Sequence, residues 1–250
     1  MKKKTLLFLG SKPIGFYCFE FLIQQQNELN IEVMGLLSND NPTFNPDLSL
    51  KQLATQHGIA TMDALDNMPE VDFLVSVQFH EILKANHLAK AKILAINLHM
   101  APLPDYRGCN QFSFAILDGK REFGTTLHVM DSGIDHGDIL FEKRFPIPEA
   151  CWVQDLYQLT FEASIDLFKQ HIKDILVGNY TRTPQAELIP ERGYSLHYRH
   201  EMATIKQVDL SWNEEKIARH VRACSMPGFE PPYALVHGEK IYLSRTWQKG

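Results

Sequence analysis

Asn97, His99 and Asp135 are the residues of this sequence whose types and spacing best suit chemistry. Asn97 and His99 lie in a largely apolar run from residue 93 to 99, which is typical of a buried β-strand. Residues two apart on a strand project from the same face, so an amide donor is expected beside a titratable imidazole. Such a pair suits a reaction in which a carbonyl oxygen gains negative charge while the attacking group loses a proton. The pattern indicates acyl transfer.

Asp135 belongs to an acidic, glycine-containing segment, residues 131–138. The spacing of its acids does not match the loop that binds calcium, and one alternative is a solvated turn between two strands. The functional interpretation is a carboxylate that orients or charge-balances His99, in the way that an acid holds a base. We therefore predict that an amide, an imidazole and a carboxylate act together.

The turn after the first apolar run, residues 10–15, lies where dinucleotide-binding folds have their glycine fingerprint. Position 12 is Lys, the middle glycine of that fingerprint is missing, and no Lys follows Gly15. Neither a nicotinamide cofactor nor a nucleotide triphosphate loop is indicated. The free backbone amides, Ser11 and Lys12 are candidates to hold a phosphate group, and the alternative is a tight turn without a ligand.

The composition limits the classes of protein that fit. With 250 residues, 44% hydrophobic and 22% charged, the chain is typical of a globular protein with a full core. A formal net charge of −5 provides no sequence-wide basic field, which argues against a nucleic-acid partner. No secretory signal is recognisable, and no apolar run reaches the ~20 residues that span a bilayer. We predict a cytoplasmic protein without a membrane partner.

The four cysteines are Cys18, Cys109, Cys151 and Cys224, and they lack the close spacing of zinc or redox sites. We interpret them as free thiols and predict no metal site. Cys109 lies beside the suspected site, where a small buried side chain is favoured over a nucleophile.

Apolar runs and amphipathic segments alternate along the first 180 residues, which is typical of an α/β fold. We predict a mostly parallel sheet with helices on both faces. Strands are expected at residues 5–9, 31–37, 59–62, 71–77, 93–99, 125–129 and 139–145. Helices are expected at residues 13–26, 48–57, 81–91, 110–117 and 152–176.

Near residue 180 the pattern changes to short polar pieces. We therefore predict a catalytic domain at residues 1–180 and a small C-terminal extension at residues 181–250. Within the extension, a helix is expected at residues 216–224 and a β-hairpin at residues 233–243, which turns at His237-Gly238.

Several motifs together resemble the catalytic core of the folate-dependent formyltransferases. These motifs are Asn97-Leu98-His99, Pro102-Leu103-Pro104, Tyr106-Arg107-Gly108, Gly124-Thr125-Thr126-Leu127-His128 and Asp135-His136-Gly137. The resemblance covers most of residues 1–180, and Trp212 with the helix that follows extends it into the tail. It implies a Rossmann-like fold and 10-formyltetrahydrofolate as co-substrate.

The resemblance also implies roles for individual residues. By motif, Asn97, His99 and Asp135 match the catalytic triad of that family. Gln78 and Phe79 match the loop whose backbone holds the pterin ring of folate, and Asp138 lies in the second loop that lines the same pocket.

The segments after the core indicate the subfamily. Methionyl-tRNA formyltransferases continue into a complete C-terminal barrel, while glycinamide ribonucleotide transformylases are generally shorter. Residues 100–110, 192–197 and 229–233 look most like the enzymes that formylate amino sugars attached to nucleotides. The expected acceptor is dTDP-4-amino-4,6-dideoxyglucose or a similar sugar, for surface polysaccharide (O-antigen, lipopolysaccharide) synthesis. A methionyl-tRNA formyltransferase-like enzyme and a non-catalytic folate-binding module remain alternatives.

The residues expected to bind the nucleotide sugar are Ser11, Lys12, Arg107, Arg192, His197 and Arg199. Arg192, His197 and Arg199 are candidates for the diphosphate, because guanidinium groups suit paired phosphate oxygens, and ordinary surface charge is an equal alternative. The hairpin at residues 233–243 is a candidate to join the sheet edge of a second copy, so a homodimer is expected.

Overall fold

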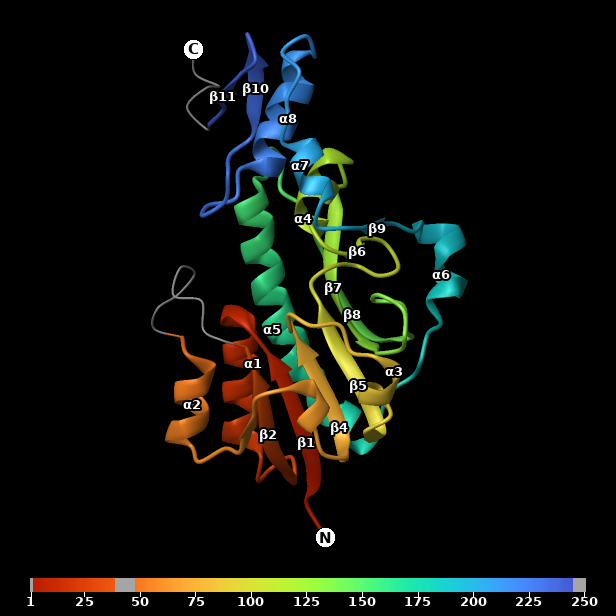
Figure 1. The fold of residues 1–250 in the computed structure, drawn as a ribbon. Coiled ribbons are helices and arrows are strands. Elements are labelled where there is room, and N and C mark those ends of the chain that lie inside the picture. Colours follow the sequence, from red (N-terminus) through yellow and green to blue (C-terminus); the bar gives the residue numbers. More distant parts are fainter. Residues whose placement is uncertain (1, 39–47, 245–250) are drawn as a thin grey trace.

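The computed structural model describes residues 2–38 and 48–244 of the chain. Its centre is a seven-stranded sheet with the strand order β3-β2-β1-β4-β5-β7-β8 (Figure 1). The strands are β1 Lys4–Gly10, β2 Ile31–Leu37, β3 Thr61–Met62, β4 Val71–Val77, β5 Ala91–His99, β7 Glu122–Val129 and β8 Ile139–Pro146. The pairs among β1 to β5 are parallel, while β7 and β8 are antiparallel at one edge. The sheet is mostly parallel, as predicted.

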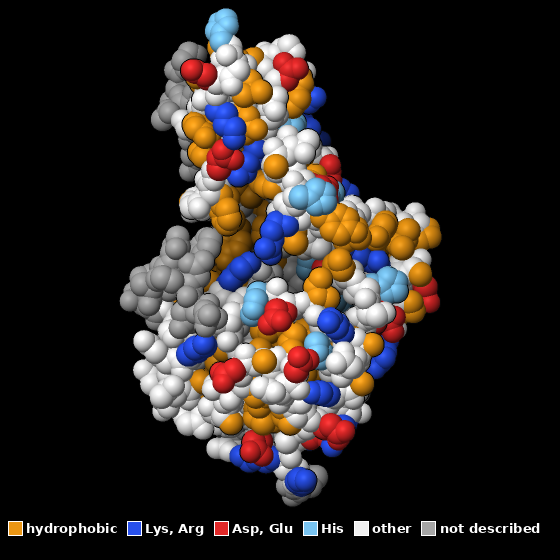
Figure 2. All heavy atoms as spheres, viewed as in Figure 1, with side chains coloured by type: hydrophobic (Ala, Val, Ile, Leu, Met, Phe, Trp, Pro, Cys, Tyr) orange, Lys and Arg blue, Asp and Glu red, His pale blue; other side chains and the backbone are white. Residues whose placement is uncertain are grey.

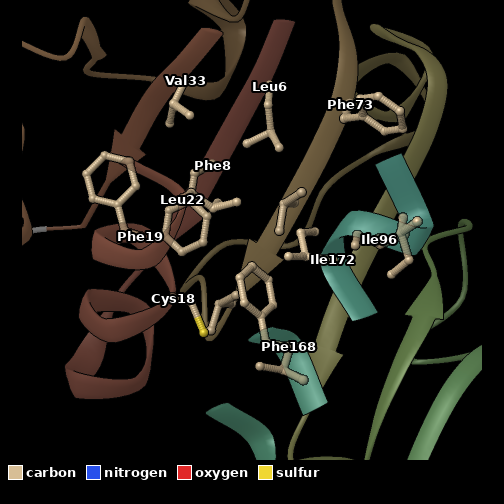
Figure 3. Close-up of a cluster of buried hydrophobic side chains, with 14 of the residues drawn as sticks. Leu6, Phe8, Cys18, Phe19, Leu22, Val33, Phe73, Ile96, Phe168 and Ile172 are labelled. Carbon is tan, nitrogen blue, oxygen red and sulfur yellow. The ribbon is translucent and has the colours of Figure 1, made fainter. Parts of the chain in front are cut away.

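Both faces of the sheet are covered, which is why β1 is apolar throughout. Its side chains alternate between two cores, with Leu6 and Phe8 in one and Leu7 and Leu9 in the other. The first core is closed by the helices α1 Lys12–Gln25, α2 Leu50–Gln56 and α5 Val153–Val177. Figure 3 shows Phe19 of α1 and Phe168 of α5 in this core. The second is closed by the short helical turns η1 Leu65–Asn67 and α3 Ala85–Leu88. The predicted α/β class with helices on both faces is confirmed.

The residues after α5 pack against the sheet domain. Their elements are α6 Gln185–Arg192, β9 Leu196–His197, α7 Glu201–Ile205, α8 Glu214–Cys224, β10 Tyr233–Val236 and β11 Glu239–Tyr242. β9 pairs in parallel with β6 Arg107–Gly108, and α8 buries Ala223 and Cys224 in one core with Ile116 of α4 Gln111–Leu117. The segment after residue 180 therefore contributes backbone hydrogen bonds to the loop that follows β5.

The predicted β-hairpin is present and turns where expected. Its strands β10 and β11 are antiparallel, and the two residues between them, His237 and Gly238, have φ angles of 52° and 85°. Two successive positive φ angles are the geometry of the two-residue hairpin turn that matches the twist of the strands.

The predicted helix at residues 81–91 is wrong in extent. Only the four residues of α3 are helical, and β5 already begins at Ala91, where it pairs with Val71 of β4. The apolar pattern of a helix continues to residue 91, but the chain pairs with β4 from Ala91 onward and the helix ends earlier. The hydrogen bonds to β4 outweigh the local helical preference. The sequence prediction also missed η1, α6, α7 and the β6–β9 pair, whose short polar segments carry no clear period.

Among residues 2–38 and 48–244, no helix combines the length and the apolar character needed to span a membrane.

Candidate active site

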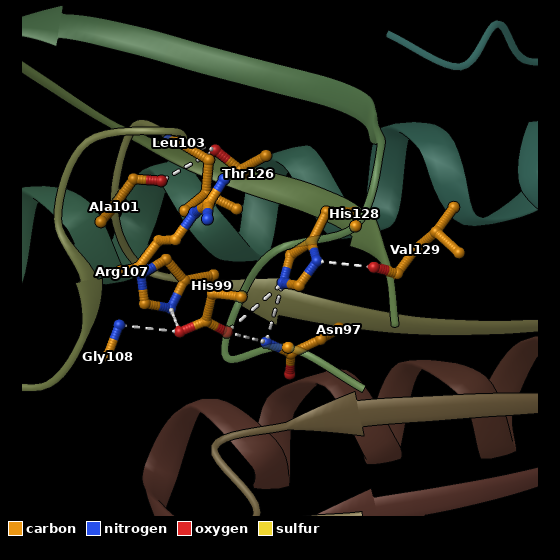
Figure 4. A network of polar contacts seen from close by, with 12 residues as sticks. Asn97, His99, Ala101, Leu103, Arg107, Gly108, Thr126, His128 and Val129 are labelled. Atoms are coloured by element: carbon orange, nitrogen blue, oxygen red, sulfur yellow. Dashed lines mark hydrogen bonds and ion pairs between the residues drawn. The ribbon is translucent and has the colours of Figure 1, made fainter. Parts of the chain in front are cut away.

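Asn97 and His99 lie at the carboxyl end of β5 and project from one face, as predicted (Figure 4). The antiparallel neighbour β7 places His128 opposite Asn97 and Thr126 opposite His99. The loop between β7 and β8 brings Asp135 to these side chains. Residues far apart in the sequence therefore meet at one point of the sheet, with His99 and His128 each at least 96% buried, being 4% and 2% exposed.

The Asp135 carboxylate is the centre of the site. Its Oδ2 accepts from the Gly108 amide at 2.9 Å and lies 3.4 Å from His99 Nδ1. Its Oδ1 accepts from Asn97 Nδ2 at 3.3 Å and lies 3.5 Å from His128 Nε2. The structure thus brings together the three residues expected from the sequence and adds a backbone amide and a second histidine (Figure 4).

These contacts hold Asp135 ionised. Burial by itself raises the pKa of the Asp135 carboxyl, but His99, a hydrogen bond from His128 and the Gly108 amide outweigh it and hold the pKa well below its ordinary value. A carboxylate with so low a pKa is a weak base. Asp135 is therefore suited to orient a ring and balance its charge, and poorly suited to take a proton at neutral pH.

His99 lies between two hydrogen-bond acceptors. Its Nε2 is 2.9 Å from the Tyr106 carbonyl oxygen, and its Nδ1 faces the Asp135 carboxylate. A neutral imidazole carries one N–H and satisfies one acceptor, whereas the imidazolium satisfies both. The surroundings of His99 therefore stabilise the ring after it has accepted a proton.

His128 was not predicted as a site residue. Its Nδ1 lies 2.8 Å from the Val129 carbonyl oxygen, which is an acceptor only, so Nδ1 carries a hydrogen. Its Nε2 lies 3.1 Å from Asn97 Nδ2 and 3.5 Å from Asp135 Oδ1. The available signal was its place in the predicted strand at residues 125–129. What could not be seen is the β5–β7 register that puts it opposite Asn97.

Lys12 and Arg199 are two cationic residues whose charges act on each other near the site. Lys12 Nζ donates to Gln78 Oε1 at 2.9 Å, and the Ser11 hydroxyl donates to the Gln78 carbonyl oxygen. Desolvation and the positive charge of Arg199 lower the pKa of the Lys12 amine, so two cations act on each other here. On the face shown in Figure 2, Lys and Arg side chains gather at a hollow between the sheet and the C-terminal segment. Such a pair of cations is suited to an anion.

The other predicted sugar-nucleotide ligands have partners inside the protein. Arg192 pairs with Glu142 at 2.8 Å, and His197 stacks on Phe114 with ring centroids 3.6 Å apart. Arg107 is buried, donates to Gln185 and lies 4.8 Å from the centroid of the Tyr194 ring. The structure does not bring these three residues into one cluster with Lys12, and their role in binding stays a prediction.

The residues expected at the folate pocket lie on two sides of the site. Phe79 follows Gln78 after β4 and packs against the second core of the sheet. Asp138 lines a cavity of about 280 Å³ between the loop of residues 131–138 and residues 182–186. Contacts with folate stay predictions for Gln78, Phe79 and Asp138.

Comparison with known proteins gives the class. The model of the Formyl transferase family matches residues 24–172, which is more than half of the chain, so this protein belongs to that family. The chain is 27% identical to a GDP-perosamine N-formyltransferase from Brucella melitensis over 172 residues, 69% of this chain and 64% of that protein. It therefore matches less than two thirds of that relative's length. A methionyl-tRNA formyltransferase from Clostridium perfringens is 30% identical over 254 residues, 95% of this chain and 78% of that protein.

The fold is shared with a solved structure. The N-formyltransferase from Helicobacter canadensis in complex with folinic acid and dTDP-3-aminofucose superposes with a TM-score of 0.77, at 22% identity. The match covers 96% of this chain and 86% of that one. At this identity the likeness shows the fold.

Proposed function

We propose that this protein transfers the formyl group of 10-formyltetrahydrofolate to the primary amine of a nucleotide-linked amino-deoxy sugar. The observation that carries the proposal is the Asp135 carboxylate, which is bonded to Asn97, faces His99 and His128 and accepts from the Gly108 amide. The similarity to a GDP-perosamine N-formyltransferase supports an amino-sugar acceptor. The ligands of the Helicobacter canadensis structure support a folate co-substrate and a nucleotide sugar.

The geometry supports a path for the proton. The neutral amine attacks the formyl carbon, a C–N bond forms, and Asn97 donates an N–H to the developing oxyanion. The proton released by the amine passes to His99, because Asp135 and the Tyr106 carbonyl stabilise the resulting imidazolium. As the bond from the carbon to folate N10 breaks, the imidazolium returns the proton to N10, which leaves tetrahydrofolate and the formamide.

The diphosphate of the acceptor is proposed to lie between Lys12 and Arg199. Burial and then the charge of Arg199 lower the pKa of the Lys12 amine, and a bound anion would offset both effects by stabilising the charged amine. The position of Lys12 at the start of α1 adds free helix N–H groups on the same side. The particular nucleotide and sugar, with dTDP-4-amino-4,6-dideoxyglucose as the first candidate, are part of this proposal.

Replacing Lys12 or Arg199 by Met should weaken acceptor binding while the chemical step continues. A hydrogen bond to a charged group contributes about 1.5–3 kcal/mol, so KM for the nucleotide sugar should rise roughly 10-fold to 100-fold in each variant. We expect kcat to change less than about 2-fold, because neither side chain is seen in contact with the Asp135 cluster. Steady-state kinetics with each substrate varied in turn measures this. The control is Lys92→Met, which removes an exposed lysine that pairs with Glu70.

Mass spectrometry tests the function itself. The protein is incubated with 10-formyltetrahydrofolate and a panel of dTDP-, UDP- and GDP-linked amino sugars, with charged initiator tRNA alongside. A one-formyl mass gain on a sugar nucleotide supports the proposal and names the acceptor. Folate binding without formylation of any acceptor would contradict it in favour of a binding module.

The second candidate is a methionyl-tRNA formyltransferase, favoured by the 30% identity over 95% of this chain. It predicts formylation of the charged tRNA in the same assay and binding that weakens steeply with salt. The net charge of −5 argues against it, since tRNA binding relies on a positive field.

We also propose that the hairpin of β10 and β11 joins two copies of the chain. Leu235, Ile241 and Tyr242 are about half exposed on it, at 48%, 50% and 53%. Replacing Leu235 and Ile241 together by Lys should shift the protein from dimer to monomer in light scattering coupled to gel filtration, because buried lysines without partners oppose association. A monomeric parent protein at micromolar concentration would contradict the dimer.

A further inference from the structure

Gln185, the first residue of α6, is buried at 3% exposure. Both the oxygen and the nitrogen of its side-chain amide form hydrogen bonds within the protein. Its Oε1 accepts from Arg107 Nε at 3.0 Å and from Arg107 Nη2 at 2.6 Å. Its Nε2 donates to the backbone carbonyl oxygens of Asp135 at 2.9 Å and Gly137 at 2.8 Å. One amide therefore connects the buried arginine after β5 to the loop that carries the Asp135 carboxylate.

The chemistry of the partners leaves one orientation for this amide. Arg107 is only a donor and the two carbonyl oxygens are only acceptors, so a flipped Gln185 amide would place like groups against each other at every contact. Both lone-pair positions of the oxygen and both hydrogens of the nitrogen are engaged. The guanidinium also polarises the amide and makes its N–H groups stronger donors. The side chain is therefore held rigidly, as a positioning device must be.

The loop requires such support because its backbone is held in an unfavourable conformation. Asp135 has a φ of 45°, in the left-handed region that non-glycine residues rarely adopt. Gly137 lies so close to β7 that an added Cβ would sit 2.0 Å from the Val129 carbonyl oxygen. The two carbonyl groups that Gln185 binds belong to Asp135 and Gly137. These hydrogen bonds therefore hold the backbone that sets the direction of the Asp135 carboxylate.

The backbone and the side chain of Asp135 are tied to the same dipeptide. Arg107 reaches the Asp135 carbonyl through Gln185, and the neighbouring Gly108 amide binds the Asp135 carboxylate at 2.9 Å. Because both links start from β6, a shift of the loop would break them together. The position of the carboxylate relative to His99 depends on this closed set of hydrogen bonds.

We propose that Gln185 is a positioning residue for formyl transfer, acting through Arg107 and the Asp135 loop, so that the segment after α5 completes the active site. It lies outside the family match at residues 24–172 and beyond the boundary predicted at residue 180. The inference rests on the proposed function for its kinetic consequence, while its structural content is independent of the substrate.

The test compares Gln185→Met with Gln158→Met. Gln158 is exposed on α5 and bonds to Glu162 at 2.8 Å, so its replacement is a matched control that removes an amide with no part in the Asp135 contacts described above. Since a misplacement of about 1 Å can cost about 100-fold, kcat of Gln185→Met should fall roughly 10-fold to 100-fold. The KM values for both substrates should change less than about 3-fold, because Gln185 is proposed to position the reacting groups and not to bind substrate.

Gln185→Glu separates positioning from folding. Its carboxylate pairs with Arg107, which offsets part of the cost of presenting oxygen to the Asp135 and Gly137 carbonyls. Circular dichroism and the unfolding temperature establish that the variant is folded before kcat is compared. We expect the same loss of kcat as in Gln185→Met, and this variant carries the test if the Met variant does not fold. Parent-like kcat in the folded Gln185 variants would overturn the proposal.

Hydrogen exchange gives a readout that needs no substrate. The Gly108 amide donates to the Asp135 carboxylate and the Val129 amide donates to the Asp138 carbonyl at 2.8 Å. In both Gln185 variants these amides should exchange at least about 5-fold faster than in the parent, while the exchange rates of the amides of α5 should stay the same. Unchanged hydrogen exchange at both amides would overturn the proposed positioning role of Gln185. A parent protein that formylates no acceptor would contradict the proposed function and leave this exchange comparison as the test of Gln185.

Discussion

His99→Ala is expected to lower kcat for formyl transfer by roughly 10⁴-fold or more, because it removes two contributions at once. General acid–base transfer by a positioned side chain contributes about 10²–10⁴-fold, and stabilisation of a developing oxyanion about 10²–10³-fold. In the proposed mechanism the same ring has both functions. It accepts the proton, and its imidazolium, held by Asp135 and the Tyr106 carbonyl, places positive charge beside Asn97 and the oxyanion. Single-turnover formylation followed by mass spectrometry measures the loss.

The control for this variant is His57→Ala, which removes an exposed histidine at the end of α2. We expect kcat of the control to stay within about 2-fold of the parent, as is usual for exposed positions away from the site. Folate binding by calorimetry should be retained in both variants. A His99→Ala protein with more than about a tenth of the parental kcat would contradict the assignment of His99 as proton acceptor.

Asp135→Asn is expected to lower kcat by about 10⁴-fold with the fold preserved, the size of effect known for an acid that orients a catalytic histidine. The amide is nearly isosteric, but it has no charge to balance the imidazolium. Its NH₂ group would also face a donor, either the Gly108 amide or Asn97 Nδ2, which the carboxylate now accepts from at 2.9 and 3.3 Å. His99 would therefore lose both its orientation and its stabilised charged form.

The same variant has an expected pH signature. The pKa of Asp135 is held below its ordinary value, so the folded state gains stability from this carboxylate above the unfolded pKa of about 3.9 and loses it as the pH falls below that value. Asp135→Asn should therefore lose less stability than the parent between about pH 4 and pH 2, measured by denaturant unfolding. Asp166→Asn, on the exposed side of α5, is the control and should follow the parent curve. Parental turnover in Asp135→Asn would contradict the proposed mechanism.

Much of the fold could be predicted because its signals are local. The strands of the parallel sheet are apolar runs buried on both faces, as in Val71–Val77, and Pro13 marks the first turn of α1. The helix at residues 81–91 failed because pairing of Ala91 with Val71 is decided by a strand distant in sequence. Local periodicity indicates on which face of an element a residue lies. It does not indicate where pairing with a neighbouring strand ends that element.

The candidate site divides in the same way. Asn97 and His99 could be placed on one face of a strand from their spacing alone, because the side-chain period of a strand is two. The acidic segment at residues 131–138 indicated a carboxylate partner for His99, and the motif resemblance assigned it to Asp135. The structure brings this carboxylate to both side chains. His128 was in a predicted strand, but its contact with Asn97 depends on the antiparallel register of β5 and β7.

By itself, the sequence determined the alternation of strands and helices, the hairpin turn at His237-Gly238 and the residue types available for acyl transfer. These follow from local backbone preferences and from the period of apolar side chains. Only the tertiary structure decided that Gln185 binds the Asp135 loop and that His128 and Gly108 share its carboxylate. Such contacts join residues that are distant in the sequence, so local sequence patterns do not predict them. They depend on the register of the sheet and on the packing of the segment after α5 against the loops that follow β5 and β7.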